Sequence, residues 1–378
     1  DPEDFIFYNK LAGYYLQFLR ETGNLNYLDL ASRAARASLN VLPPEMNTGG
    51  LAMLAQVELA SHEFASARDH ATQLTKLEAR KSYPFEILGD ALMELGEYDQ
   101  AVAAYKEMEK RSDGVNTQAR MARYALLRGD TELAKKRYSF ALALALEQVP
   151  AARETVAWCR WQLGEVAFSV GQYEEAEKHY QDALTTFPDY YRALASMGRV
   201  RAARGDLAGG IEYYQRAIKI FPDLIFVAAL GDLYKLTGKE TEAATQYALV
   251  EQIGKLNAAQ GALYNRQLAL FYADHDMKAE EAYANALKEY EARKDIYGAD
   301  AVAWTALKAG KVSEAQSAMK EALRLGTRDA RMYYHAGVIA RAAGNNSAAR
   351  DYLERALKLS PQFDPLQAGI ARKALEQE

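Results

Sequence analysis

The chain has 378 residues, a formal net charge of −5 and a single cysteine, and each value limits what it can be. Its 46 basic and 51 acidic residues are spread along the whole length, so no basic block of the kind that binds nucleic-acid phosphates is present. Cys159, being alone, cannot form an intramolecular disulfide. A chain of this length would form two or three globular domains unless internal repeats organise it differently.

Glycine and tyrosine recur along the chain at one shared spacing. The intervals between successive copies are 33, 42, 34 and 33 residues, for Gly96, Gly129, Gly171, Gly205 and Gly238 as for Tyr105, Tyr138, Tyr180, Tyr214 and Tyr247. A period near 34, with small and aromatic residues at fixed offsets, indicates a stack of helical hairpins. The one interval of 42 predicts lengthened helices around residues 143–157.

The unit at residues 157–190 shows the chemistry of the repeat. Its marker residues are Leu163-Gly164, Gly171, Tyr173, Ala176, Tyr180, Ala183-Leu184 and Pro188. Ala176, Tyr180 and Leu184 share one helix face and are predicted to be buried. Gly164 and Ala176 leave room for two helices to approach closely, and Gly171 suits the left-handed backbone after a helix end.

These residues resemble the tetratricopeptide repeat family, whose motif pairs Leu-Gly in a first helix with Ala, an aromatic residue, Ala and Pro in and after a second. The resemblance implies an all-α, right-handed superhelical α-solenoid of about ten hairpins with a C-terminal capping helix. We expect one solenoid over residues 1–378, with repeats at 5–47, 48–81, 82–114, 115–156, 157–190, 191–223, 224–261, 262–295, 296–329 and 330–363 and the cap at 364–378.

The resemblance also implies a role. Members of the family bind a partner polypeptide along a concave groove lined by the first helix of each repeat. We therefore expect a non-catalytic protein-interaction scaffold with a protein or peptide partner, no cofactor and no nucleic acid.

The register of the first helices selects a groove surface. Trp158, Trp161, Glu165 and Phe168 form one stripe, and the neighbouring first helices add Arg120, Arg123, Arg192 and Arg199. Tryptophan and arginine concentrate binding energy at interfaces, so this surface is predicted to bind a peptide with apolar anchors and carboxylates. Alternatively, the tryptophans only pack against the lengthened helices that precede them.

A second predicted patch lies nearer the C-terminus. It consists of Trp304, Arg331, Tyr334 and Arg341, which share the groove-facing side of two first helices.

No constellation of catalytic or metal-binding residues is assembled in the sequence. His62-Glu63 begins like a zinc-protease motif, but Ser66 stands where the second histidine should be. Asp274-His275-Asp276 falls at the turn of the weakest repeat, with Asp276 in place of the turn glycine. We interpret Asp274, His275 and Asp276 as the short polar residues that commonly form a turn between helices. We expect neither a metal site nor an enzyme.

Two alternative roles remain open. The aromatic first helix, residues 5–19, is too short and too polar to span a membrane, but its apolar side chains could form a homo-oligomer. The chain could also be the regulatory or sensing arm of a larger protein. We expect a soluble protein, either cytoplasmic or exported after removal of a signal peptide.

Overall fold

The computed structural model describes residues 4–259 and 266–376, and every regular element in these ranges is an α-helix. The chain forms two compact units, Asp1–Met121 and Ala122–Glu378, and the boundary falls inside one helix, α7 (Val115–Leu127). Within the described ranges, no helix is both long enough and apolar enough to cross a membrane.

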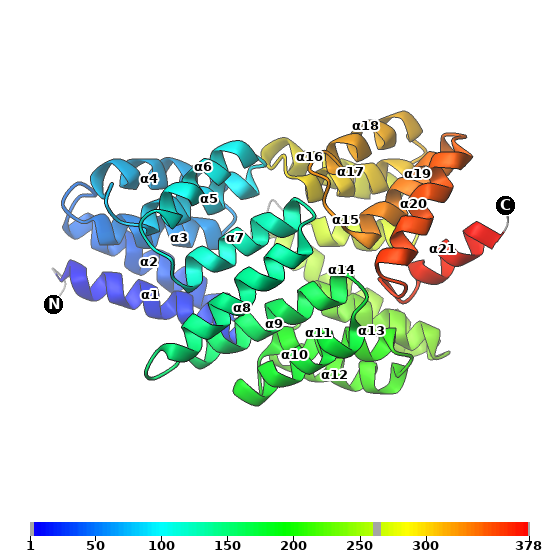
Figure 1. The fold of residues 1–378 in the computed structure, drawn as a ribbon, viewed down its shortest axis with the longest axis horizontal. Helices are drawn as coiled ribbons and strands as arrows, with labels where there is room; N and C mark the ends of the chain where they lie inside the picture. The colour runs from blue at the N-terminus through cyan, green and yellow to red at the C-terminus, as the bar shows by residue number, and fades with distance from the viewer. Residues whose placement is uncertain (1–3, 260–265, 377–378) are drawn as a thin grey trace. The chain divides into compact units, whose positions relative to one another are not determined.

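Unit 1 is a short series of antiparallel hairpins (Figure 1). Its helices before α7 are α1 (Phe5–Thr22), α2 (Asn26–Val41), α3 (Thr48–Ala60), α4 (Phe64–Leu77), α5 (Tyr83–Glu94) and α6 (Tyr98–Glu109). Leu51, Leu74 and Ile87 are buried where α3, α4 and α5 meet. Each hairpin therefore covers an apolar face of the next.

Unit 2 continues the same pattern. After α7 it contains α8 (Thr131–Glu147), α9 (Arg153–Ser169), α10 (Tyr173–Thr186), α11 (Tyr191–Ala203), α12 (Leu207–Ile220), α13 (Leu224–Leu236), α14 (Glu240–Ala259), α15 (Arg266–Asp274), α16 (Ala279–Ala292), α17 (Ile296–Lys308), α18 (Val312–Ala322), α19 (Ala330–Ala342), α20 (Asn346–Leu359) and α21 (Gln367–Glu376). The odd-numbered helices from α9 to α19 pack against one another as well as against their hairpin partners.

A glycine on the first helix of a hairpin receives a tyrosine ring from the second. A Cβ atom added to Gly164 would lie 2.3 Å from the ring of Tyr180, so even alanine would collide there. Ala176, Tyr180 and Leu184 are all buried, which confirms the sequence prediction. The close approach at Gly164 makes room for an aromatic ring rather than for a second backbone.

The turns between paired helices use a left-handed residue. Gly171, with φ of 76°, is one of several glycines in this conformation. Asp276, with φ of 54°, takes the same conformation in the weak repeat, as its place in the sequence predicts. His62, with φ of 62°, also has a left-handed backbone, in the turn between α3 and α4. This turn position accounts for His62 as part of the hairpin.

The long sequence interval corresponds to two long helices. Both α8 and α9 have 17 residues, whereas the next two helices have 14 and 13. The prediction of lengthened helices around residues 143–157 is therefore confirmed.

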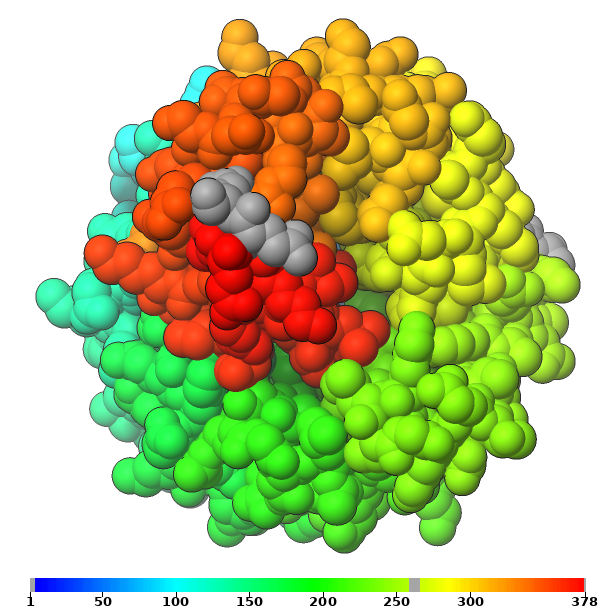
Figure 2. All heavy atoms as spheres, turned by 90° about the vertical axis from the view of Figure 1, so that its right-hand side faces the viewer, coloured from blue at the N-terminus to red at the C-terminus, as the bar shows by residue number. Residues whose placement is uncertain are grey.

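Unit 2 closes on itself through contacts between residues almost 200 positions apart. The hydroxyl of Tyr173 lies 2.9 Å from Ser360 Oγ and accepts a hydrogen bond of 2.7 Å from the Gln362 amide. Thr327 Oγ1 donates a 2.5 Å bond to the carbonyl of Leu127. Figure 2 shows the helices of this unit arranged around a hollow that the red C-terminal segment partly covers. The repeats thus form a closed ring rather than an open groove.

The final helix begins later than the predicted cap, which was expected to start at residue 364. It begins at Gln367, after Asp364 has accepted hydrogen bonds from the amides of Leu366 and Gln367. Ala371 is buried in this helix, and Ile370 is 53% exposed. The Gln367 side chain donates to Asp274 Oδ1 over 2.6 Å and so connects the start of α21 to the end of α15.

Overpacking the hairpin core should destabilise the protein. Leucine at the fully buried Ala176 has no space, so Ala176→Leu should cost about 1–3 kcal/mol of unfolding free energy. The matched control is Ala284→Leu, at an exposed position of α16. Denaturant unfolding followed by circular dichroism measures both, and equal stability of the two variants would contradict the packing described above.

Candidate functional site

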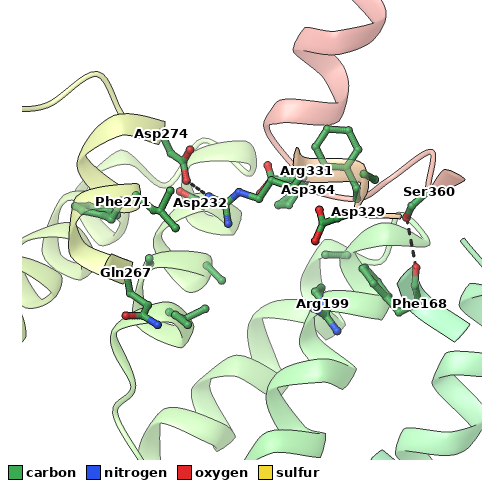
Figure 3. Close-up of a pocket in the computed structure, with 18 of the residues that line it drawn as sticks. Phe168, Arg199, Asp232, Gln267, Phe271, Asp274, Asp329, Arg331, Ser360 and Asp364 are labelled. Atoms are coloured by element: carbon green, nitrogen blue, oxygen red, sulfur yellow. Dashed lines mark hydrogen bonds and ion pairs between the residues drawn. The ribbon is translucent and has the colours of Figure 1, made fainter. Parts of the chain in front are cut away.

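The hollow of unit 2 contains a cavity of about 520 Å³. Its walls come from the first helices α9, α11, α13 and α15 and from the segments that precede α19 and α21. We call it the central cavity. Figure 3 shows its lining side chains, which include Phe168, Arg199, Asp232, Asp274 and Arg331.

A partly buried carboxylate follows the repeated glycine in several first helices. The tyrosine that fills the space beside that glycine donates its hydroxyl hydrogen to this carboxylate. The distances are 2.7 Å from Tyr180 to Glu165, 2.8 Å from Tyr247 to Asp232 and, in unit 1, 2.7 Å from Tyr105 to Asp90. A buried hydroxyl group needs a hydrogen-bond acceptor, and the carboxylate supplies it, so the tyrosine ring can be buried without an unsatisfied polar atom.

Glu165 is held by an ion pair at the wall of the central cavity. Arg199 Nη2 lies 2.6 and 2.7 Å from its two carboxylate oxygens, and Ser196 Oγ donates to it over 2.8 Å. Burial acts to raise the pKa of Glu165, but the charge of Arg199 and the hydrogen bonds from Arg199, Tyr180 and Ser196 outweigh it and hold the pKa below its usual value.

Phe168 lies beneath the same arginine. Its ring is buried, and the Arg199 guanidinium carbon stands 4.0 Å from the ring centroid. Both residues line the central cavity together with Glu165. Three of the eight predicted groove residues therefore meet at one surface.

The two predicted tryptophans lie outside that lining. Trp158 packs edge-on against Tyr138 of α8, with ring centroids 5.9 Å apart. Trp161 donates its indole hydrogen to Ser196 Oγ over 2.9 Å, and the Arg192 guanidinium covers its ring at 5.6 Å. Both indoles are half-buried against the core, and Arg192 is exposed.

The two predicted arginines of α7 lie on either side of the unit boundary. Arg120, in unit 1, binds Asp90 with its Nη2 at 2.7 Å and Glu86 at 2.9 Å. Its charge is thus already neutralised by two carboxylates. Arg123, in unit 2, is exposed.

Asp274 joins the second predicted patch to the central cavity. It pairs with Arg331 and accepts the indole hydrogen of Trp304 over 2.8 Å. Figure 3 shows Arg331 extending from beside Asp364 towards Asp232 and Asp274. Arg331 and Asp274 line the cavity, whereas Trp304 is buried behind them.

The remaining members of the second patch have structural contacts. The buried ring of Tyr334 packs on Trp304 at 5.6 Å. Arg341 donates to the carbonyl of Ala374 in α21 over 2.8 Å. Of this patch, Arg331 alone belongs to the described lining of the central cavity.

His275 forms a charged contact in the cavity wall. Its Nε2 lies 2.8 Å from Asp232 Oδ1 and its Nδ1 lies 2.7 Å from the Phe271 carbonyl oxygen. Burial acts to lower the pKa of His275, but the hydrogen bond to Asp232 and the charge of that carboxylate outweigh it and raise the pKa above its ordinary 6.5.

Two further carboxylates stand at helix starts on the cavity wall. Asp329 Oδ1 accepts from the Met332 amide over 3.0 Å at the start of α19, as Asp364 does before α21. Burial raises the pKa of both carboxyls above the ordinary value of 3.8. Neither forms an ion pair with any cation in the described ranges.

Sequence analysis missed most of these acidic residues as part of the site. Of the acidic residues in the described cavity lining, Glu165 alone was among the predicted site residues. A usable signal existed, because Asp90, Glu165 and Asp232 each follow the repeated glycine and precede the repeated tyrosine by 15 residues. Nothing in the repeat pattern predicts Asp329 or Asp364 at the same cavity.

In residues 4–259 and 266–376, side chains of metal-binding type do not form a cluster that could hold a metal ion. Among the described residues, no three His, Cys, Asp or Glu side chains are placed to hold a metal ion. Cys159 is buried, and burial raises the pKa of its thiol to about 12. That thiol stays protonated at neutral pH.

The His275–Asp232 pair should make stability depend on pH. Because folding raises the pKa of His275, the pair stabilises fully below the unfolded pKa and this stabilisation is lost as the pH rises through the folded pKa. The difference in melting temperature between the natural protein and His275→Gln should therefore be larger at about pH 5.5 than at about pH 9. Lost ring packing contributes equally at both values, so a pH-independent difference would exclude a charged pair.

Family sequence models match most of the repeats. One model of the tetratricopeptide repeat matches residues 52–116, 161–225 and 301–362, which is about half of the chain, and a second matches residues 115–189. These matches include the glycine and tyrosine positions of several hairpins, such as Gly89 with Tyr105 and Gly164 with Tyr180.

Individual relatives match smaller parts. Type II methyltransferase M.CeqI of Rhodococcus hoagii is 30% identical over 135 residues, covering 33% of this chain and 26% of the relative. The human cell division cycle protein 16 homolog is 24% identical over 202 residues, covering 50% of this chain and 31% of that protein. The chain thus spans between a quarter and a third of the length of these curated relatives.

A solved structure of the human IFIT1 dimer with PPP-AAAA has a similar fold. The two chains are 13% identical with a TM-score of 0.51, over 93% of this chain and 82% of that one. At this identity the likeness concerns the fold alone. The family assignment follows from the sequence models, which match about half of the chain and more: this chain belongs to the tetratricopeptide repeat family.

Proposed function

We propose that the protein is a non-catalytic scaffold that binds a partner polypeptide in the central cavity of unit 2. The observation that carries this proposal is the cavity itself, about 520 Å³ in volume and enclosed by the first helices of successive repeats. This volume lies in the range of ordinary ligand pockets, and it accommodates a few side chains of an extended segment.

The lining of the cavity suits a polypeptide. Ile225 is 50% exposed although it belongs to the apolar α13, and it lines the cavity together with Leu270 and Phe271 of α15. Polar groups such as Arg199 and Asp274 interrupt this apolar wall. An apolar surface with a few fixed polar groups favours a ligand that has apolar side chains and a hydrogen-bonding backbone.

We propose Glu165, Phe168, Arg199 and Arg331 as residues that contact the partner. They are the predicted site residues that line the cavity. Trp161 and Arg192 would act indirectly, because Trp161 binds Ser196 and Ser196 in turn binds Glu165.

A catalytic role and nucleic-acid binding both find less support. Most polar side chains at the cavity are engaged in ion pairs or helix caps that hold the fold together. More carboxylates than arginines line it, which disfavours phosphate groups. The same binding role suits a regulatory arm of a longer protein, since the curated relatives extend beyond the matched segment.

Filling the central cavity should abolish binding without unfolding the protein. Ala228 lines the cavity and is half-buried, so the indole of Ala228→Trp would project into the empty volume. A labelled peptide selected on the natural protein from a random library should bind this variant at least about tenfold more weakly, or 1.4 kcal/mol.

The control for this experiment is Ala284→Trp, on the exposed face of α16. Fluorescence anisotropy measures the affinity, and circular dichroism verifies the helical content. Undiminished binding by Ala228→Trp would place the peptide elsewhere on the molecule.

A second candidate function is self-association through α1. Phe7 and Tyr14 are 53% and 59% exposed, and Phe18 is 44% exposed on the same helix face. Large exposed apolar side chains that share one face are typical of protein interfaces. A second copy of this chain would cover them.

Light scattering tests this second candidate. If α1 forms the interface, Phe7→Ser combined with Tyr14→Ser should reduce the molar mass from that of an oligomer to that of a monomer. Ile370→Ser, which removes an equally exposed side chain from α21, should leave the mass unchanged. A monomeric natural protein would rule this candidate out.

A further inference from the structure

One tyrosine of the repeat lacks the acceptor that its counterparts have. In hairpins of both units, the tyrosine that packs on the repeated glycine donates to the carboxylate that follows this glycine. These tyrosines are Tyr105, Tyr180 and Tyr247. In the hairpin of α11 and α12 the equivalent ring is Tyr214, which packs against Gly198. The residue after Gly198 is Arg199, and a guanidinium has no acceptor, so the Tyr214 hydroxyl cannot be satisfied in the same way.

The hydroxyl of Tyr214 has no hydrogen-bond partner among the residues that the structure describes. The residue is nevertheless only 6% exposed, and it belongs to the lining of the central cavity. Burial raises the pKa of Tyr214, so the hydroxyl keeps its hydrogen at neutral pH. A buried donor without an acceptor is unfavourable, and a ligand that supplies the acceptor removes this cost.

The charged groups around this hydroxyl all belong to the cavity wall. Besides burial, they act on the pKa of Tyr214 in both directions: Arg199 lowers it, and Asp232, Asp364 and Glu165 raise it. Arg199 is already paired with Glu165. Asp232 is already paired with His275, and the charge of Arg331 acts on Asp364. Each of these cations thus has an acid of the wall beside it, and a carboxylate of a ligand would meet three acids at this hydroxyl.

The missing acceptor is therefore expected to be a neutral group. A lysine or arginine side chain offers only donors, and the acids of the wall disfavour a carboxylate. The neutral acceptor that every polypeptide carries is the amide carbonyl, in the main chain and in asparagine and glutamine side chains. Ala202, Ala228 and Ala229 line the cavity from α11 and α13, and side chains this small let a ligand's main chain approach the wall closely.

We propose that the Tyr214 hydroxyl donates a hydrogen bond to an amide carbonyl of the partner polypeptide in the central cavity. The ligand then supplies the acceptor that a carboxylate of the protein supplies to the equivalent tyrosines. Arg199 creates this opening, because it pairs with Glu165 of the preceding repeat and leaves the hydroxyl without an acceptor. This inference rests on the proposed function, and it adds one group by which the partner is held.

Two tyrosine-to-phenylalanine variants separate binding from stability. Tyr214→Phe removes a hydroxyl that has no partner, so its melting temperature should equal or exceed that of the natural protein. The matched control is Tyr105→Phe, at the same repeat position in unit 1, which removes the donor of a 2.7 Å bond to Asp90. Its melting temperature should fall by about 2–4 °C. Equal destabilisation by both variants would mean that Tyr214 has an acceptor within the protein, and would overturn the proposal.

The binding probe is the labelled peptide selected on the natural protein for the cavity-filling experiment. Tyr214→Phe should bind this peptide at least about fivefold more weakly, because the ring stays and only the hydrogen bond is lost. Tyr105→Phe should bind it with unchanged affinity. The two variants are therefore expected to show opposite patterns, one losing affinity and the other losing stability.

Modified peptides identify the carbonyl that is bound. In one set, each main-chain amide in turn is replaced by an ester, whose carbonyl is a weaker acceptor. In a second set, each asparagine or glutamine is replaced by alanine. One modification should weaken binding to the natural protein and have a smaller effect on Tyr214→Phe, which lacks the donor. An ester with this behaviour identifies a main-chain carbonyl, and an alanine identifies a side-chain amide.

The possible failures can be distinguished. If Ala228→Trp abolishes binding while Tyr214→Phe binds as tightly as the natural protein, the cavity holds the peptide and the role of Tyr214 is wrong. The role is also wrong if every modified peptide loses the same affinity for both proteins. If Ala228→Trp leaves binding intact, the proposed function fails and this inference fails with it.

Discussion

The fit of a tyrosine ring against a glycine is the contact on which the rest of the structure depends. At Gly164 the ring of Tyr180 occupies the space of a missing Cβ atom, so the hairpin can close only with glycine there. Because burial leaves the tyrosine hydroxyl without water, the next residue on the first helix, Glu165, accepts its hydrogen. A buried carboxylate then needs a cation, which Arg199 supplies from the following repeat. One steric requirement therefore produces both the hairpin and the charged pair that links two repeats.

These linked steric and hydrogen-bonding requirements explain which features could be predicted from the sequence. Glycine, alanine and tyrosine recur because each hairpin has the same steric needs, so the spacing alone predicted the helices, the buried face and the left-handed turn at Asp276. Ring closure had no such signal. It depends on Tyr173, Ser360 and Gln362, which meet only after many repeats have each added a small rotation. Small differences in helix packing add up over that distance, and a repeat motif does not encode them.

The site was harder to predict than the fold for a related reason. Register predicted which face of a first helix turns inward, and Glu165, Phe168 and Arg199 from that prediction line the central cavity. It could not tell whether a charge on that face is free or paired, because the partner belongs to a neighbouring repeat. Arg120 illustrates the difficulty, since two carboxylates bind a side chain that looks available in the sequence. An ion pair neutralises a charge that looks free in the sequence. The charge that the central cavity offers to a ligand therefore depends on which side chains are paired.

Several residues at the cavity depart from the repeat. Arg199 stands in α11 at the position that carries an acid in α5, α9 and α13, and so it extends back to Glu165 instead of receiving a tyrosine hydroxyl. Asp274 and His275 belong to the weakest repeat, where the turn glycine is missing. If every repeat carried the same motif residues, the hairpins would still stack, but each first helix would present the same side chains to the inner wall. Where the motif is not kept, charged side chains such as Arg199, Asp274 and His275 lie at the wall of the central cavity. Such departures from regular packing are expected at functional sites.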